Sequence, residues 1–260
     1  MLIVLYVIAA LIGISLGLMG AGGAIVAVPA FVYLGDVPPT IASGYALFVV
    51  AVATAVGAIE YVRNKLVDWR SVLAFGVTTL TSIAVVRRFI LPQLPSEFSV
   101  FQVDVELDLI LMLAFAVILV AAGSAMLWKK PKPHTDEPAH FGRLTFFGLV
   151  IGIISGFLGV GGGFLMTPAL VLWANIDMKK AVGTSLVLIS ANGLAGVAAD
   201  LSGNVAYDWS FLLTFTGLAT AGIVIGTALA KRIDGQRLKA GFGYFVLTLG
   251  VAVLIRELTS

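Results

Sequence analysis

The chain has 260 residues, of which 60% are hydrophobic and only 12% are charged, and its mean hydropathy is +1.07. A soluble domain of this length needs more polar surface to cover its core, so the composition predicts helices that face lipid. The net charge is only +2, and the basic residues fall in short clusters between apolar runs, which argues against a nucleic-acid-binding surface. The absence of cysteine excludes disulfides and thiolate metal sites.

The first apolar run covers residues 2–34 and is too long for one straight span. At 1.5 Å per residue, about 30 helical residues extend ~45–50 Å, whereas the hydrocarbon core of a bilayer is about 30 Å thick. A typical signal peptide is not expected, because no basic residue precedes the run and it continues to Leu34. A second long run covers residues 144–173. Both runs must therefore break or fold back.

Six further apolar runs are each about 20 residues long, which is enough to cross a bilayer as a helix. In chain order they cover residues 41–60, 71–91, 108–128, 181–199, 210–230 and 239–255. A polar, proline-containing segment at 129–143 holds both histidines and is expected to be a flexible linker. The sequence thus predicts an all-α, polytopic membrane protein.

Each long run carries a glycine cluster followed by a proline. In the first run Gly17–Gly23 precedes Pro29, and in the second run Gly156–Gly163 precedes Pro168. Glycine clusters and prolines interrupt helices, so these clusters mark where each run is expected to break.

The two clusters belong to a longer internal repeat. They align without gaps at a shift of 139 residues, and after a one-residue slip the match extends to the Asp-Trp pairs at 68–69 and 208–209. Spaced glycines, prolines and an Asp-Trp pair do not readily align by chance. We therefore interpret the chain as two repeats, residues 1–128 and 144–260, joined by the linker 129–143.

The basic residues indicate how the chain crosses the membrane, because loops rich in Lys and Arg prefer the cytoplasm. The basic loops are 63–70, 129–143, 177–180 and 231–239, and the segments without Lys or Arg are 35–40, 92–108 and 200–208. If each long run is a hairpin, all four basic loops face the cytoplasm, both termini lie outside and the repeats are inverted. If each run crosses once, the chain has eight crossings and parallel repeats, and two basic loops break the rule.

The glycine clusters are the main candidates for a substrate site. Non-helical backbone at membrane depth is tolerated only inside protein or beside a water-filled cavity. The helix that follows each break presents free N–H groups and the positive end of its dipole, which together bind anions. The candidate residues are Gly20, Ala21, Gly22 and Gly23 in the first run and Gly159, Val160, Gly161, Gly162 and Gly163 in the second. For Gly13, Gly17, Gly152 and Gly156 we favour close helix packing.

Polar side chains within the spans are further candidates for anion binding. They are Ser43, Tyr45, Thr184 and Ser185 at the starts of two spans, Asn192 in mid-span, and Arg87 and Arg88 near the end of a span. Hydroxyl, amide and guanidinium groups all donate to oxyanions. The alternatives are hydroxyls bonded to helix carbonyls and arginines that snorkel to headgroups. Glu60 and Asp200, which are equivalent in the repeat, are either coupling-proton carriers or solvated carboxylates at the interface.

The paired motifs resemble those of the TauE/SafE sulfite exporter family. They read Gly17-xx-Gly20-x-Gly22-Gly23-x5-Pro29 and Gly156-xx-Gly159-x-Gly161-Gly162-Gly163-x4-Pro168, and Arg87-Arg88 followed by Pro92 and Pro95 looks like one bacterial branch. The resemblance covers nearly the whole chain and implies transport of sulfur-containing anions such as sulfite and sulfonates. Ala24 stands where the second motif has Gly163, so the two breaks are not expected to be identical in role.

These observations predict a secondary transporter of the bacterial inner membrane that exports a small sulfur oxyanion or sulfonate by alternating access. A passive anion channel of the same fold and uptake instead of export remain as alternatives. We expect no enzyme, because the spans contain no histidine, no cysteine and no paired carboxylates at mid-depth. We also expect no cofactor, no metal and no nucleic-acid partner, with the lipid bilayer as surroundings and a homodimer as a further option.

Overall fold

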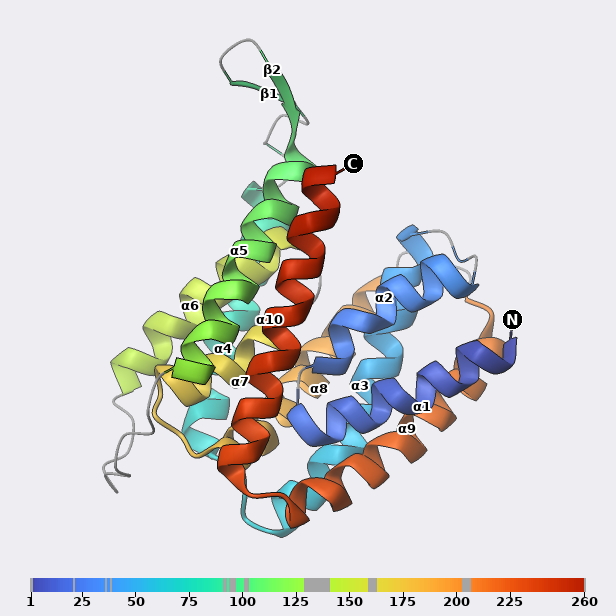
Figure 1. The fold of residues 1–260 in the computed structure, drawn as a ribbon, viewed down its shortest axis with the longest axis vertical. Coiled ribbons are helices and arrows are strands. Elements are labelled where there is room, and N and C mark those ends of the chain that lie inside the picture. The colour runs from blue at the N-terminus through green and yellow to red at the C-terminus, as the bar shows by residue number, and fades with distance from the viewer. Residues whose placement is uncertain are drawn as a thin grey trace.

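The computed structural model describes residues 2–20, 22–35, 37, 39–90, 93, 97–100, 103–128, 141–158, 163–202 and 207–259. Within these ranges the chain forms ten α-helices, one π-helical turn and one β-hairpin (Figure 1). The helices before the linker are α1 (Leu2–Met19), α2 (Gly22–Gly35), α3 (Pro39–Arg63), α4 (Trp69–Val85) and α5 (Leu107–Trp128). Those after it are α6 (Phe141–Leu158), α7 (Gly163–Leu172), α8 (Met178–Ser202), α9 (Trp209–Arg232) and α10 (Gly235–Thr259).

The helix content confirms the prediction of an all-α, polytopic membrane protein. In the described part of the chain, four helical segments are long and apolar enough to cross a membrane. They are Gly44–Arg63, Met178–Ala198, Trp209–Arg232 and Gly235–Ile255. Many large apolar side chains on these and other helices face outward, which suits a surface in contact with lipid.

The helices of the two halves correspond one to one. Shifting the bounds of α1 by 139 residues gives those of α6, and shifting α3 by the same number gives α8. Helices α4 and α9 begin at Trp69 and Trp209, the tryptophans of the Asp-Trp pairs. Before α9, the Asp208 carboxylate accepts a hydrogen bond from the Phe211 N–H, as an N-cap residue does.

Both long apolar runs fold back on themselves. Gly35 at the end of α2 lies beside Leu5 near the start of α1. In the second half, Trp173 follows α7 and stacks on Phe147 of α6, with ring centroids 4.6 Å apart. Each run is therefore a helical hairpin whose two arms are antiparallel, and each is broken at the predicted glycine cluster.

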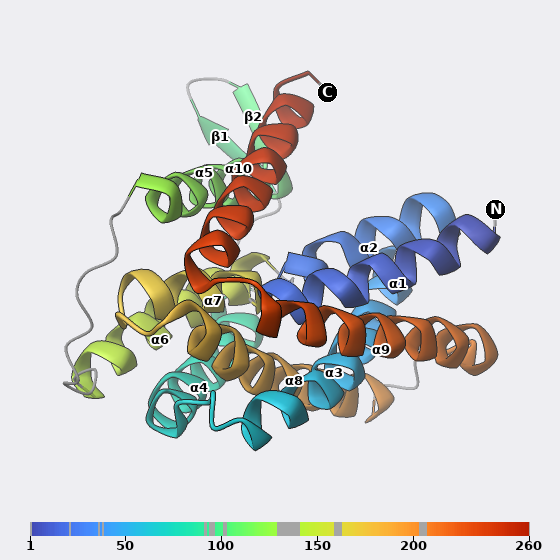
Figure 2. The same cartoon turned by 60° about the horizontal axis from the view of Figure 1, so that its bottom comes forward.

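Helices α4 and α9 are exchanged between the two halves of the chain. α9 packs along α1 and against α3, whereas α4 packs along α6 and against α8. Two lobes result: the first lobe is α1, α2, α3 and α9, seen to the right in Figure 1, and the second lobe is α4, α6, α7 and α8. Helices α3 and α8 join the lobes, and α5 pairs with α10 (Figure 2). Each of these main contacts therefore has a counterpart between the equivalent helices of the other half; for example, the contact of α1 with α9 corresponds to that of α6 with α4.

The equivalent helices α3 and α8 run antiparallel where they join the lobes. Gly183 near the start of α8 packs on Tyr61 near the end of α3, and Gly193 farther along α8 packs on Ala51. Helices α5 and α10 are antiparallel in the same way. Interhelical contacts of this closeness are typical of small residues in membrane proteins.

Glycines also make the contacts within each lobe close. A Cβ atom at Gly13 of α1 would lie 1.9 Å from the carbonyl oxygen of Ala219 in α9. In the second lobe, a Cβ atom at Gly152 of α6 would lie 2.6 Å from the Cβ of Ser82 in α4. The predicted packing role is confirmed for Gly13, Gly17 and Gly152, while the surroundings of Gly156 lie outside the description.

The basic loops that the structure describes meet at one end of the molecule. Lys231 at the end of α9 forms an ion pair with Glu60 near the end of α3, and the Lys179 ammonium donates to the Lys231 carbonyl oxygen at 3.2 Å. Gly235 at the start of α10 lies near Asp177, which precedes α8. The C-terminus and the β-hairpin lie at the opposite end (Figure 1).

Two local features differ from the predictions. The span predicted at 71–91 ends in a π-helical turn, η1 (Val86–Ile90). The segment 92–108, predicted only as a loop, contains the antiparallel strands β1 (Glu97–Val100) and β2 (Val103–Glu106). Polar and apolar residues alternate in these strands, which is typical of a β-hairpin. The prediction of a loop did not take this alternation into account.

Candidate functional site

The first glycine break places a left-handed residue between α1 and α2. Gly20 has a φ of +78°, which residues with a Cβ rarely adopt, and its N–H donates to the Leu16 carbonyl oxygen at 2.8 Å. This bond ends α1 in the manner of a glycine C-cap. Among the other predicted residues, Gly22 and Gly23 open α2, and Ala21 lies outside the described residues.

This first break lies against the second half of the chain. The Thr167 hydroxyl of α7 is 3.3 Å from the Met19 carbonyl oxygen and 3.0 Å from the Ser185 hydroxyl of α8. A Cβ atom at Gly20 would lie 3.0 Å from the same Thr167 oxygen. Thr167 and Ser185 are fully buried. Of the predicted residues, the structure thus brings Gly20 and Ser185 together.

Thr167 itself was missed by the sequence analysis. A signal for it was present, because this hydroxyl directly precedes Pro168 in an otherwise apolar stretch of the second hairpin. An isolated hydroxyl in such a stretch needs a partner inside the protein, since lipid offers none.

The second break separates α6 from α7. Gly159, Val160, Gly161 and Gly162 fall in it and lie outside the part of the chain that the structure describes. Gly163 is the buried first residue of α7 and packs against Ile189 of α8. Asn192 lies one helical turn farther along α8, and both polar atoms of its amide are buried without a hydrogen-bond partner. The start of α7 and this amide therefore lie on neighbouring parts of the same face of α8.

Tyr45 and Thr184 are equivalent in the repeat and make equivalent contacts. The Asp208 N–H donates to the Tyr45 hydroxyl at 2.7 Å, and the Asp68 N–H donates to the Thr184 hydroxyl at 2.9 Å. Each bond ties a central helix to the start of the exchanged helix in its own lobe. Thr184 also donates to the Lys180 carbonyl oxygen at 2.7 Å, as the back-bonding alternative predicts. A structural role accounts for both hydroxyls; the side chain of Ser43 lies outside the description.

Arg87 and Arg88 lie in the π-helical turn η1, which contacts α6. π-Helical turns are rare and frequently occur at functional sites. The backbone of these residues is described and their side chains are not. Their proposed contact with an anion therefore stays a prediction.

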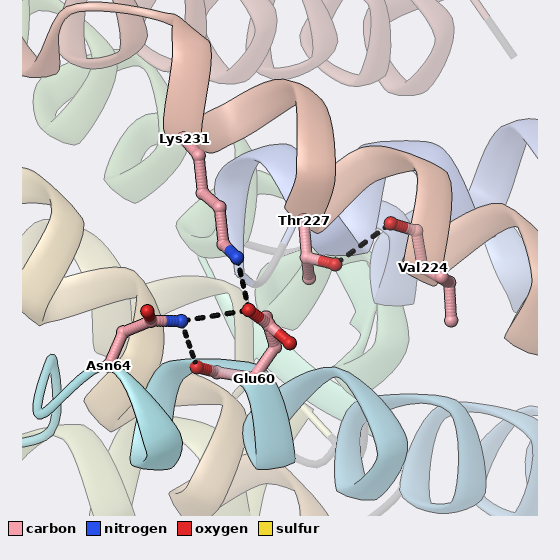
Figure 3. A network of polar contacts seen from close by, with 5 residues as sticks. All are labelled: Glu60, Asn64, Val224, Thr227 and Lys231. Carbon is pink, nitrogen blue, oxygen red and sulfur yellow. Dashed lines mark hydrogen bonds and ion pairs between the residues drawn. The ribbon is translucent and has the colours of Figure 1, made fainter.

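Glu60 lies at the end of the molecule where the basic loops meet. Figure 3 shows its polar contacts from close by. Its carboxylate forms the ion pair with Lys231 and accepts a hydrogen bond from the Asn64 amide at 2.8 Å. The side chains of Glu60 and Lys231 are 37% and 48% exposed. Thr227, one turn before Lys231, donates instead to the Val224 carbonyl oxygen at 2.9 Å. Glu60 thus fits a solvated carboxylate at the end of a span; the side chain of the equivalent Asp200 is not described.

Glu60→Gln is expected to leave both transport and melting temperature close to those of the unchanged protein. An exposed ion pair is screened by water and salt and contributes little to stability. The measurement is anion flux in proteoliposomes together with thermal unfolding in detergent, with Lys231→Met as the matched change in the partner. A loss of flux, or of its response to a proton gradient, in Glu60→Gln alone would make Glu60 the coupling residue.

The chain is similar to known membrane transporter proteins over nearly its whole length. Residues 5–253 match the model of the family described as sulfite exporter TauE/SafE. The chain belongs to this family. A probable membrane transporter protein of Xylella fastidiosa (strain 9a5c) is 29% identical over 259 residues, which cover 96% of this chain and 94% of that protein. The probable membrane transporter protein YunE of Bacillus subtilis (strain 168) is 27% identical over 275 residues and is covered to 98%.

An archaeal relative is also similar over a shorter stretch. The probable membrane transporter protein MJ0441 of Methanocaldococcus jannaschii is 26% identical over 211 residues, or 77% of this chain and 72% of that protein. No solved structure matches the chain. The resemblance of the glycine motifs to TauE/SafE proteins is confirmed, and the chain is a multi-pass membrane transporter. Membership in a transporter family also agrees with the expectation that it is not an enzyme.

Proposed function

We propose that this TauE/SafE protein is a secondary transporter of the bacterial inner membrane that exports sulfite or an organosulfonate by alternating access. The observation that carries the proposal is the meeting of the two broken hairpins inside the molecule. Helix α2 contacts α7, and Gly20 of the first break lies against Thr167 of α7. Helices that begin in the interior of a membrane protein present free N–H groups there, and these groups can donate to the oxygens of a sulfur oxyanion.

We take residues 1–128 and 144–260 as inverted repeats and 129–143 as the linker. Antiparallel packing between the equivalent helices α3 and α8 supports this relation, because parallel repeats would place these helices side by side in the same direction. The gathering of basic loops around Lys231 supports a cytoplasmic location for that end of the molecule. The β-hairpin then lies outside.

The moving parts in this proposal are the two lobes rather than the two sequence repeats. Glycine contacts such as Gly13 to Ala219 and Gly152 to Ser82 hold each exchanged helix close to its lobe. The junction of α3 with α8 then serves as the surface between the moving bodies, and the Gly20 break reaches across it. Movement at this junction opens the site to one side of the membrane at a time.

Export of an anion is favoured by the membrane potential. With the inside negative, each outward-moving negative charge gains about 2.3 kcal/mol per 100 mV. A coupling proton is therefore not required on energetic grounds, in line with the interfacial position of Glu60. Uptake of an anion against this potential would need a large inward concentration gradient or coupling to a second ion.

Counterflow in proteoliposomes tests the function. Vesicles containing the purified protein are loaded with unlabelled sulfite or with the zwitterionic sulfonate taurine, and the entry of the same labelled compound from outside is followed. A carrier predicts saturable entry that is accelerated by the unlabelled compound inside the vesicle. High flux without saturation or acceleration would indicate a channel, and no flux of either compound would contradict the proposal.

A further inference from the structure

Ser155 of α6 is a buried hydroxyl with no hydrogen-bond partner. The residue is 1% exposed, and its Oγ is one of few buried side-chain polar atoms in the described ranges without a partner. Ser155 shares a helix face with Gly148 and Gly152, since these positions are separated by one and two turns. Both glycines pack on α4, Gly148 on Phe75 and Gly152 on the stretch that includes Ser82. Ser155 therefore faces the last part of α4, just before α6 ends at the second break.

Asn192 lies on the face of α8 that packs against α4 and the start of α7. Leu188, one turn earlier on α8, packs on Gly76 of α4, and Ile189 packs on Gly163 at the start of α7. Asn192 is related to both by one helical turn and so lies between α4 and the start of α7. Helices α4, α6, α7 and α8 lie together as the second lobe (Figure 2). Ser155 of α6 and Asn192 of α8 thus both face the interior of that lobe, and each lies close in sequence or in packing to the start of α7.

Buried polar atoms are ordinarily hydrogen-bonded, because an atom that loses its hydrogen bonds to water and gains none in the protein destabilises the fold. In the second lobe the Ser155 hydroxyl, the Asn192 N–H₂ group and the Asn192 amide oxygen all lack partners. Each of the three hydrogen-bonds readily to a ligand that enters this region. The adjacent α7, with ten residues, adds the free N–H groups of its first turn.

The two equivalent positions of the first lobe are apolar. A shift of 139 residues places Leu16 opposite Ser155 and Ala53 opposite Asn192. Leu16 and Ala53 are both 0% exposed and belong to the hydrophobic core. The two lobes therefore differ at these two positions, which are polar in the second lobe and apolar in the first, although the buried Ser15 hydroxyl of α1 also lacks a partner.

We propose that Ser155 and Asn192 form a one-sided oxyanion seat at the start of α7, and that the first lobe has no equivalent seat. This inference rests on the proposed transport function and places the anionic group of the substrate in the second lobe. The Ser155 hydroxyl, the Asn192 N–H₂ group and the first N–H groups of α7 donate to the oxyanion. The Asn192 oxygen accepts from an N–H or O–H group of the same ligand, as hydrogen sulfite and the ammonium end of taurine provide.

Binding of labelled sulfite and of taurine to the purified full chain in detergent tests the seat. The variants are Ser155→Ala and Asn192→Leu, with Asn192→Ala as a second variant if the leucine is not accommodated. The matched control is Thr216→Val in the first lobe, which removes a buried hydroxyl that donates to the Leu212 carbonyl oxygen at 2.6 Å. We expect Ser155→Ala and the Asn192 variants to weaken binding at least tenfold, and Thr216→Val to leave it within twofold.

Thermal unfolding without ligand separates binding from a structural role. Removing a polar atom that has no partner is expected to leave the melting temperature unchanged or to raise it, whereas a structural role would lower it. If the unchanged protein binds either compound and the variants at Ser155 and Asn192 each lose less than twofold in affinity, the seat is wrong and the transport proposal stands. If the unchanged protein binds and transports neither compound, the transport proposal fails and the seat fails with it.

Discussion

Gly222→Leu is expected to prevent most of the protein from folding, whereas Gly217→Leu, earlier in the same helix, is expected to fold normally. A Cβ atom at Gly222 would lie 2.2 Å from the carbonyl oxygen of Ala10 in α1, and backbone cannot move aside as a flexible side chain can. At Gly217 the same atom would have nothing within 4 Å. Overpacking ordinarily costs about 1–3 kcal/mol, and a clash with backbone belongs at the upper end of that range or beyond.

The pair is informative because both variants place the same side chain in α9. Monodispersity and melting temperature in detergent are compared for the two, with the unchanged protein as reference. Gly222→Leu should yield mostly aggregated protein or a much lower melting temperature. Equal behaviour of the two variants would show that α9 does not pack against α1, and the exchange of α4 and α9 between the halves would have to be abandoned.

Gly163→Leu is expected to remove anion binding while the protein still folds. Gly163 is the first residue of α7, so an added side chain covers the N–H groups proposed to hold the anion. Its Cβ would lie 2.9 Å from Ile189, but the contacting atoms belong to a side chain that can change rotamer. We expect at least a tenfold loss of affinity, or about 1.4 kcal/mol. Gly163→Ala, with less bulk, should show a smaller loss.

Gly241→Leu in α10 is the matched control, because a Cβ there would have nothing within 4 Å. Affinity for sulfite or taurine is measured for each folded variant, and thermal unfolding confirms that the fold persists. Unchanged affinity in a folded Gly163→Leu protein would exclude the start of α7 as the anion site.

The local structure follows closely from the sequence. The glycine clusters predict both helix breaks, and the spacing of the repeat predicts that α6 and α8 have the same lengths as α1 and α3. These features depend on residues close together in the chain, such as the run of small residues around Gly20. The positive φ of Gly20 is a conformation that glycine adopts without steric cost.

The exchange of α4 and α9 could not be predicted in the same way. It depends on which faces pack together, and the partner helices α1 and α6 are apolar on all sides and so carry little directional information. The same limit explains why Ser155 and Thr167 were missed while Ser185 and Asn192 were named. A hydroxyl in an apolar helix is visible in the sequence, but its neighbours are set by contacts with helices far away in the chain. Tyr45 was predicted to bind the anion through its hydroxyl, but in the structure this hydroxyl accepts a hydrogen bond from the Asp208 N–H.

Anomalous diffraction from crystals grown with selenite tests the central claim, that an anion binds inside the molecule at the helix breaks. Selenite has the shape and charge of sulfite, and its selenium gives a signal that locates it directly. We expect an interior peak within hydrogen-bonding distance of the start of α7, beside Ser155 and Asn192. Selenite peaks found only at exposed basic residues such as Lys231, with none at the breaks in crystals that contain saturating selenite, would contradict it.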